Sequence, residues 1–128
     1  MQPMSIVIRI ADVSIPRADL EAALNLALDR YETGRRGVTN YAQINIEEEA
    51  DYWAAASRTM LQLKDKLQAL SSAGSIGAIS LDAALSFHDD LMAGSILIPS
   101  PLAYLAGQTG IDIEISVYRT QSPDEAQG

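Results

Sequence analysis

Apolar and polar residues alternate along four stretches of this chain, and each stretch predicts a β-strand with one buried face. In the first stretch, Ile6, Ile8 and Ile10 fall on one side and Ser5, Val7 and Arg9 on the other. A short apolar run at residues 96–98, before Pro99, predicts a partner strand. The four alternating stretches cover residues 5–10, 40–48, 79–88 and 110–118.

Between these stretches the apolar residues recur at helical spacing. Leu20, Leu24, Leu28 and Tyr31 predict a helix over residues 16–30, opened by Pro16. A longer helix follows the acids Glu47, Glu48, Glu49 and Asp51 and stops at the "SSAG" of residues 71–74. A short helix is expected after Pro99 and Pro101, ended by residues 107–110. The apolar face of the long helix comprises Trp53, Ala56, Met60, Leu63, Leu67 and Leu70.

The order of these segments predicts an α+β fold. Alternating strands are typical of a sheet with one covered face, whereas a parallel sheet covered on both faces has continuous apolar runs. We therefore expect a two-layer sandwich, with helices packed on one face of a mixed or antiparallel sheet of four to five strands. At 128 residues the chain suits one domain, which we assign to residues 1–120, with residues 121–128 as a flexible polar tail.

Composition narrows the class of protein. The chain is 48% hydrophobic and 20% charged, enough apolar material for a core, and it contains no cysteine. Disulfides, thiol catalysis and cysteine-zinc sites are thereby excluded, which suits a reducing compartment. No stretch reaches the roughly 20 apolar residues that span a bilayer, and the start lacks the features of a signal peptide. We expect a cytoplasmic protein without a membrane partner.

The formal charge of -8 is unevenly distributed. Residues 67–128 hold seven acids and a single base, Arg119, whereas the preceding residues hold ten acids and eight bases. This field repels phosphate backbones and argues against nucleic-acid binding. It attracts basic protein surfaces and accelerates their encounter with the chain.

The acids Asp112 and Glu114 stand two apart in the last predicted strand. Their side chains point the same way, so neighbouring carboxylates could serve acid-base chemistry. The simpler interpretation is that Ile111, Ile113 and the following apolar residues face the core while both acids face water. If the first and last strands are neighbours, we expect Arg9 to pair with one of these acids.

Other polar motifs predict no catalytic residue, metal or cofactor. His88 is the single histidine and adjoins Asp89 and Asp90, but a catalytic zinc set has further histidine ligands, so a solvated turn is the favoured interpretation. The "TGRRG" of residues 33–37 offers two guanidinium groups to an anion or to a partner's carboxylate. It lacks the P-loop pattern, and we interpret it as an ordinary loop.

The segment "SILIPSPLAYLAGQTGIDIEISVY", residues 95–118, places a small apolar helix after proline and then an alternating strand that ends in tyrosine. It resembles a family of small bacterial domains of unknown function, similar to those encoded near polymorphic toxins, where small acidic proteins act as immunity factors. The likeness is fainter over residues 5–30. Members of the family carry tryptophan in a middle strand, whereas Trp53 here falls on a helical stripe. The resemblance implies a binding role and supplies no contact residues.

Together these features favour a non-enzymatic protein-interaction module, with an acidic immunity protein that occludes a basic toxin domain as the specific hypothesis. Two alternatives stay open: a small enzyme or ligand-binding domain that uses Asp112, Glu114 and His88, and a self-associating structural domain or homo-oligomer. The predicted partner-binding residues are Tyr41, Asp82, Asp112, Glu114 and Tyr118.

Overall fold

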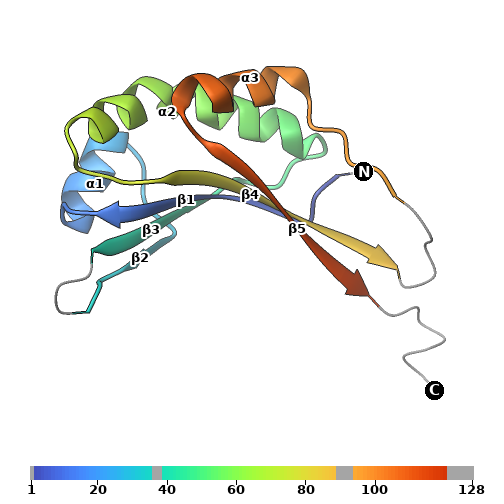
Figure 1. Ribbon diagram of the computed structural model, residues 1–128, viewed down its shortest axis with the longest axis horizontal. Coiled ribbons are helices and arrows are strands. Elements are labelled where there is room, and N and C mark those ends of the chain that lie inside the picture. The colour runs from blue at the N-terminus through green and yellow to red at the C-terminus, as the bar shows by residue number, and fades with distance from the viewer. Residues whose placement is uncertain (1, 36–38, 89–93, 121–128) are drawn as a thin grey trace.

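The computed structural model describes residues 2–35, 39–88 and 94–120. Within these ranges the chain forms three helices and five strands in an alternating order (Figure 1). The elements are β1 (Ser5–Val13), α1 (Arg17–Leu24), β2 (Arg30–Glu32), β3 (Asn40–Asn45), α2 (Tyr52–Ser72), β4 (Ile79–His88), α3 (Ser100–Thr109) and β5 (Asp112–Thr120).

All five strands belong to one sheet, in the order β2-β3-β1-β4-β5. Strand β3 lies between β1 and β2, and β1 lies between β3 and β4, so two β-α-β units interlock as a split β-α-β pair. The pairings β1–β3, β1–β4 and β2–β3 are antiparallel. Helix α3 then returns the chain so that β5 pairs with β4 in parallel. The predicted α+β sandwich with a mixed sheet is confirmed.

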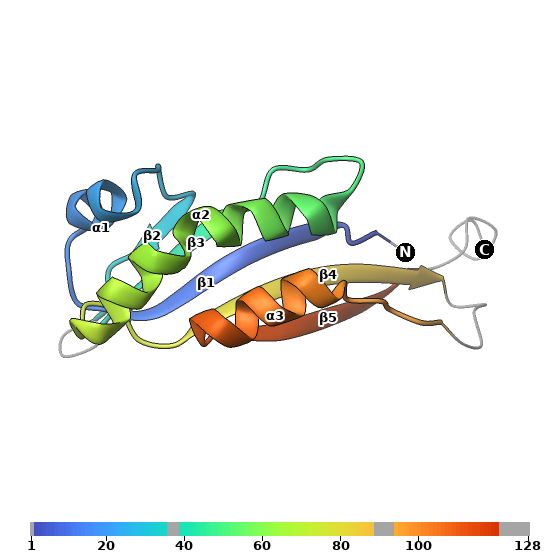
Figure 2. The same ribbon diagram turned by 90° about the horizontal axis from the view of Figure 1, so that it is seen from above.

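The helices lie on one face of the sheet and leave the other face bare, as Figures 1 and 2 show. The sheet is twisted and arched, and its bare face forms the concave underside of the arch in Figure 1. We call this bare surface the open face. Because a strand's side chains alternate between faces, each strand contributes every second residue to it.

The buried residues follow the alternation in the sequence. Ile6, Ile8 and Ile10 of β1 are fully buried, and Leu81, Ala83 and Leu85 repeat this pattern in β4. The stripe of α2 packs onto these strands, with Trp53 in the core as its helical spacing predicted. Asp51 begins α2, and its carboxylate accepts a hydrogen bond from the Ala54 amide at 3.1 Å. None of the described helices is long and apolar enough to cross a membrane.

The predicted helix over residues 16–30 is too long. Helix α1 ends at Leu24 because Asn25 adopts the left-handed conformation, with φ of 55°. Leu28 is still buried, but from an irregular segment in which the Glu21 carboxylate accepts a hydrogen bond from its amide at 2.8 Å. Tyr31 then belongs to β2, a three-residue strand that the sequence analysis missed.

The strand predicted at residues 96–98 is also wrong. Both sides of β4 are occupied by β1 and β5, so no edge remains beside β4 for this run to pair with. Ile96 and Ile98 instead pack as partly buried side chains against the core. The short helix after Pro99 is confirmed and extends to Thr109, where Gly110 takes a positive φ of 77°. The predicted tail, residues 121–128, lies outside the described residues.

Candidate functional site

All five predicted partner-binding residues lie on the open face of the sheet. Tyr41 comes from β3, Asp82 from β4, and Asp112, Glu114 and Tyr118 from β5. Each of them alternates with apolar residues of the same strand that pack toward the helices. The simpler interpretation of Asp112 and Glu114 therefore agrees with the structure, since both side chains are exposed.

The strand register brings three carboxylates together on this face. Asp82 of β4 is level with Glu114 of β5, and Ser80 is level with Asp112. On the other side of β4, Asp82 is level with Val7 and Ser80 with Arg9. Asp82, Asp112 and Glu114 thus form one cluster, which we call the acidic patch, and Arg9 is the base on β1 beside it.

Arg9 pairs with Asp82, and not with Asp112 or Glu114 as the sequence predicted. The Arg9 Nη2 atom lies 2.9 Å from Asp82 Oδ2, and Ser116 donates its hydroxyl proton to Asp82 Oδ1 at 2.8 Å. The expectation fails because β4 separates the first strand from the last. Through these two contacts the Asp82 carboxylate links β4 to both β1 and β5. Asp82 is itself only 7% exposed.

Arg9 stays charged in this setting. Burial alone lowers the pKa of its guanidinium group, but the charges of Tyr41 and Asp82 and their hydrogen bonds raise it, and the net shift is upward. Arg9 therefore stays positively charged and balances the negative charge of Asp82 at the border of the acidic patch.

Asp112 and Glu114 have no ion-pair partner among the described residues. Glu114 stands directly beside the buried Asp82, whose charge is already matched by Arg9. Like charges about 5–7 Å apart repel by roughly 0.5–1 kcal/mol in a water-like dielectric. The acidic patch is thus left with two uncompensated charges that face solvent.

Two tyrosines flank the patch in different states. Tyr41 is half-buried and donates to Gln43 Oε1 at 3.0 Å, and Gln43 in turn donates to Asn45 Oδ1 at 2.7 Å. These hydrogen bonds connect the three open-face side chains of β3 with one another. Tyr118 is 55% exposed near the end of β5 and is level with Ser86 of β4. Tyr118 is therefore the flanking aromatic group that a partner can reach.

The three residues of the enzyme alternative do not converge. His88 is level with Thr120, which lies six residues beyond Glu114 along β5. At about 3.3 Å per residue this separates His88 from Glu114 by roughly 20 Å. Among the described residues no group of three or more histidine, aspartate or glutamate side chains could hold a metal ion. The partners Asp89 and Asp90 lie outside the described residues.

The remaining polar motifs have local structural roles. Asp51 caps α2, and Glu49 forms an ion pair with Arg58 of the same helix. In the "TGRRG" segment, the Gly34 amide donates to Asn40 Oδ1 at 2.9 Å, while residues 36–37 lie outside the described ranges. Among the described residues of this loop, the contact of Gly34 with Asn40 is a structural one, and the predicted role of the two arginines stays a prediction.

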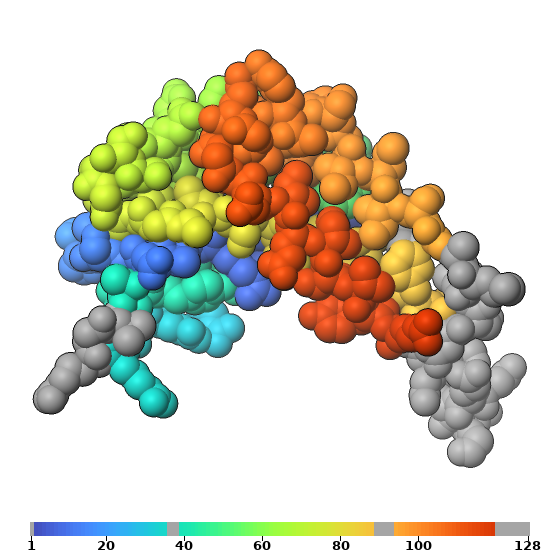
Figure 3. Space-filling model, viewed as in Figure 1, coloured from blue at the N-terminus to red at the C-terminus, as the bar shows by residue number. Residues whose placement is uncertain are grey.

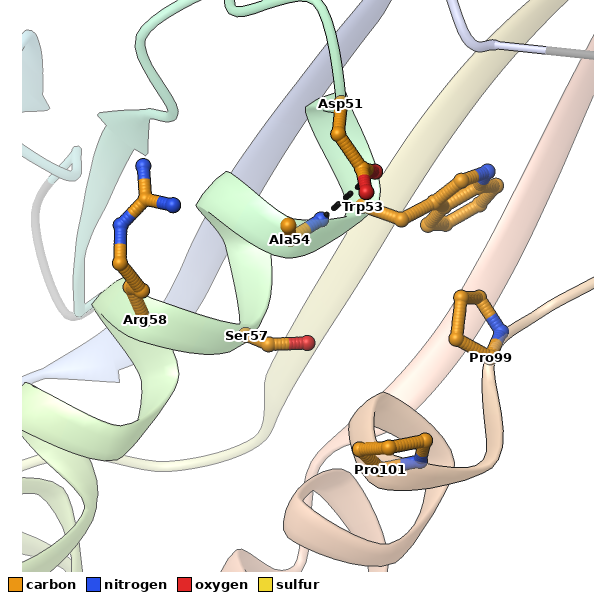
Figure 4. Close-up of a pocket in the computed structure, with 7 residues that line it drawn as sticks. All are labelled: Asp51, Trp53, Ala54, Ser57, Arg58, Pro99 and Pro101. Atoms are coloured by element: carbon orange, nitrogen blue, oxygen red, sulfur yellow. Dashed lines mark hydrogen bonds between the residues drawn. The ribbon is translucent and has the colours of Figure 1, made fainter.

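A hollow of about 280 Å³ lies on the opposite side of the molecule, between the starts of α2 and α3 (Figure 4). Its walls are mainly apolar, and the Trp53 indole reaches from α2 toward Pro99. The Trp53 Nε1 atom is buried without a hydrogen-bond partner. No sequence signal indicated this hollow, because it depends on how α2 and α3 pack. The lining residues are Asp51, Trp53, Ala54, Ser57, Arg58, Pro99 and Pro101.

Sequence reasoning also missed Ser116 as a member of the open face. Its position between Glu114 and Tyr118, at the same alternation, was the signal that could have identified it. Comparison with known proteins adds no further residue, since no family model, no curated protein and no solved structure matches this chain.

Proposed function

We propose that this protein is a non-enzymatic interaction module that binds a basic surface of another protein on its open face. The observation that carries the proposal is the pair of uncompensated carboxylates, Asp112 and Glu114, on a concave sheet surface without helices. A lysine or arginine placed between them would relieve the repulsion within the acidic patch and gain two charge-assisted contacts.

The small side chains of the open face support close approach of a partner. Ser80, Ala84 and Ser86 flank Asp82 on the open face of β4, and Ser116 lies beside Ala84 on β5. These side chains stand low above the backbone, so longer side chains of a partner can reach the acidic patch. Tyr118, level with Ser86, adds an exposed aromatic side chain to the open face. Tyrosine is enriched in protein interfaces.

The net charge of -8 supports the same choice of partner, because it accelerates encounter with basic surfaces. The resemblance of residues 95–118 to domains encoded near polymorphic toxins adds a specific identity for the partner. We propose an immunity protein that acts in the cytoplasm and occludes a basic toxin domain. In this mechanism the toxin is inhibited because its basic, substrate-binding surface is covered.

The proposal is tested with the product of the neighbouring gene, if that gene encodes a secreted protein with a basic C-terminal domain. At low salt the two purified proteins should co-elute in size-exclusion chromatography, and the dissociation constant is then measured by titration calorimetry. In nucleic-acid complexes with six to ten charge contacts, the binding affinity falls steeply as the salt concentration rises. We expect the affinity of this complex to fall with salt as well, but less steeply.

Two matched double variants distinguish binding at the open face from a general effect of the net charge on affinity. Asp112→Lys with Glu114→Lys should weaken binding by about a hundredfold or more, since two attractive contacts of roughly 1.4 kcal/mol each are lost and like charges take their place. Asp19→Lys with Asp65→Lys changes the net charge equally on exposed helix positions and should alter the constant less than about threefold. Equal losses in both variants, or no complex with the unaltered chain, would contradict the proposal.

A further inference from the structure

Strand β5 forms a long unpaired edge of the sheet. It runs for nine residues, Asp112–Thr120, and among the described residues it pairs with β4 alone, on its inner side. The opposite edge, β2, has three residues. In Figure 2, β5 follows the margin of the sheet with α3 lying above β4 and β5, and Figure 3 shows its surface on the front of the molecule. A row of backbone N–H and C=O groups on the outer side of β5 is therefore open to another strand.

The side chains on the helix-facing side of β5 remain partly open to solvent as well. Ile113 and Ile115 are only partly buried against the core, and Val117 is 54% exposed. Protected edge strands usually carry a proline or an inward-pointing charge. Positions 113–117 contain no proline, and their helix-facing residues are aliphatic. An added strand would cover this aliphatic row.

Helix α3 carries small residues at two exposed positions. Gln108 of α3 faces α2, where its side chain accepts a hydrogen bond from Lys64 and its carbonyl accepts one from Gln68. The exposed positions Ala103 and Gly107 of α3 are one turn apart and carry minimal side chains. A methyl group added to Gly107 would meet no atom within 4 Å. These two positions of α3 therefore present no bulky side chain to a strand that joins β5.

We propose that the strand that joins this edge is β5 of a second copy of the chain, paired antiparallel around Ile115. In this register Asp112 lies opposite the second copy's Tyr118, and Glu114 lies opposite its Ser116. Ile113 lies opposite Val117, and Ile115 lies opposite itself. Each carboxylate then faces a hydroxyl-bearing side chain and each aliphatic side chain faces another, so the strand complements itself.

This self-complementarity is the reason to prefer a second copy over an unrelated strand. The acids stand in the first half of β5 and the hydroxyl groups in its second half. A two-fold axis places the first half of one strand against the second half of the other, so each acid meets a hydroxyl group. The axis is normal to the sheet, so the open faces of both copies lie on one side of a continuous sheet. The acidic patches stay accessible, and the inference is independent of the proposed function.

The mass in solution tests the dimer. Light scattering from micromolar to near-millimolar protein should show a rise from the monomer mass of 13.8 kDa to twice that value. Added salt should strengthen this association, because it screens two chains of charge -8, whereas it should weaken a complex with a basic partner. Failure of one proposal is thus distinguishable from failure of the other.

Two substitutions of the same kind locate the contact. Val117→Lys places an ammonium group opposite Ile113 of the second copy and should raise the dissociation constant about tenfold or more. Leu61→Lys changes an aliphatic residue of α2 that is also largely exposed, at 64%, and should leave the dissociation constant within about twofold. A monomer at every concentration, or equal effects of both variants, would overturn the proposal.

Cysteine cross-linking tests the register, because the chain has no cysteine of its own. In one copy, residues 112 and 118 are about 20 Å apart along the strand and cannot bond to each other. The double variant Asp112→Cys with Tyr118→Cys should form a disulfide-linked dimer under mild oxidation, visible on a non-reducing gel. Each single variant should stay monomeric on the gel. Cross-linking by either single variant to the same extent would refute this register.

Discussion

The ion pair between Arg9 and Asp82 predicts an unequal response to the loss of its two halves. The Asp82 side chain is 9% exposed, whereas the Arg9 side chain is 45% exposed. Loss of the guanidinium group leaves a nearly buried carboxylate beside the like charge of Glu114. Loss of the carboxylate charge leaves a cation that water can already reach. Removing the arginine should therefore destabilise the fold more than neutralising the aspartate.

The magnitudes follow from the contacts. Arg9→Met keeps the apolar stem and removes the contact of 2.9 Å to Asp82. A hydrogen bond to a charged group contributes about 1.5–3 kcal/mol, and the partial exposure of Arg9 places the expected loss near 2 kcal/mol. Asp82→Asn keeps an oxygen that can accept from Arg9 or Ser116, so we expect a loss of about 0.5–1 kcal/mol.

Urea unfolding followed by far-ultraviolet circular dichroism measures these losses in the free energy of unfolding. In thermal unfolding, the midpoint of Arg9→Met should fall by roughly 8 °C for a domain of this size. The double variant should lose less than the two single losses together, with a coupling of about 1 kcal/mol. Adding Glu114→Gln to Arg9→Met should recover roughly 0.5 kcal/mol. A larger loss for Asp82→Asn than for Arg9→Met, or strict additivity, would refute the reasoning.

Substitutions at four further positions test the fold through the same unfolding measurements. Gly77→Ala should cost about 1–3 kcal/mol, because its methyl group would lie 2.7 Å from the Asp12 Cβ atom. Gly107→Ala lies in α3 with open space around it and should stabilise the protein by roughly 0.5–1 kcal/mol; a loss there would contradict the helix geometry. Asp51→Ala removes the cap of α2 and should cost about 1 kcal/mol, with Asp51→Asn as a control near the unaltered stability. Leu67→Ala leaves a cavity in the core and should cost about 2–5 kcal/mol; a loss under 1 kcal/mol would place Leu67 at the surface.

Alternation and helical spacing were sufficient for the parts of the fold that repeat over many residues. The ten residues of β4 alternate cleanly, and the stripe of α2 runs over five turns, so both were predicted close to their observed bounds. The same alternation predicted that Asp82, Asp112 and Glu114 share one face. Side-chain period is a local property of a strand, which is why one sequence reveals it.

Properties that depend on contacts between distant segments could not be read from the pattern. Strand β2 is too short to show a period, and the turn at Asn25 interrupts a leucine spacing that otherwise suits a helix. Strand order decided that Arg9 meets Asp82, 73 residues away in the chain, and that Asp82 is buried. The hollow beside Trp53 likewise depends on the packing of α2 against α3.

The central place of β1 has a consequence for how the protein is made. This strand pairs with β3 on one side and with β4 on the other, so its second neighbour leaves the ribosome about 4–15 s after it at roughly 5–20 residues per second. During that interval Ile6, Ile8 and Ile10 of β1 are not yet fully buried. Nascent chains that stop before β4 should therefore depend on chaperones, whereas chains that reach α3 can close the core around them.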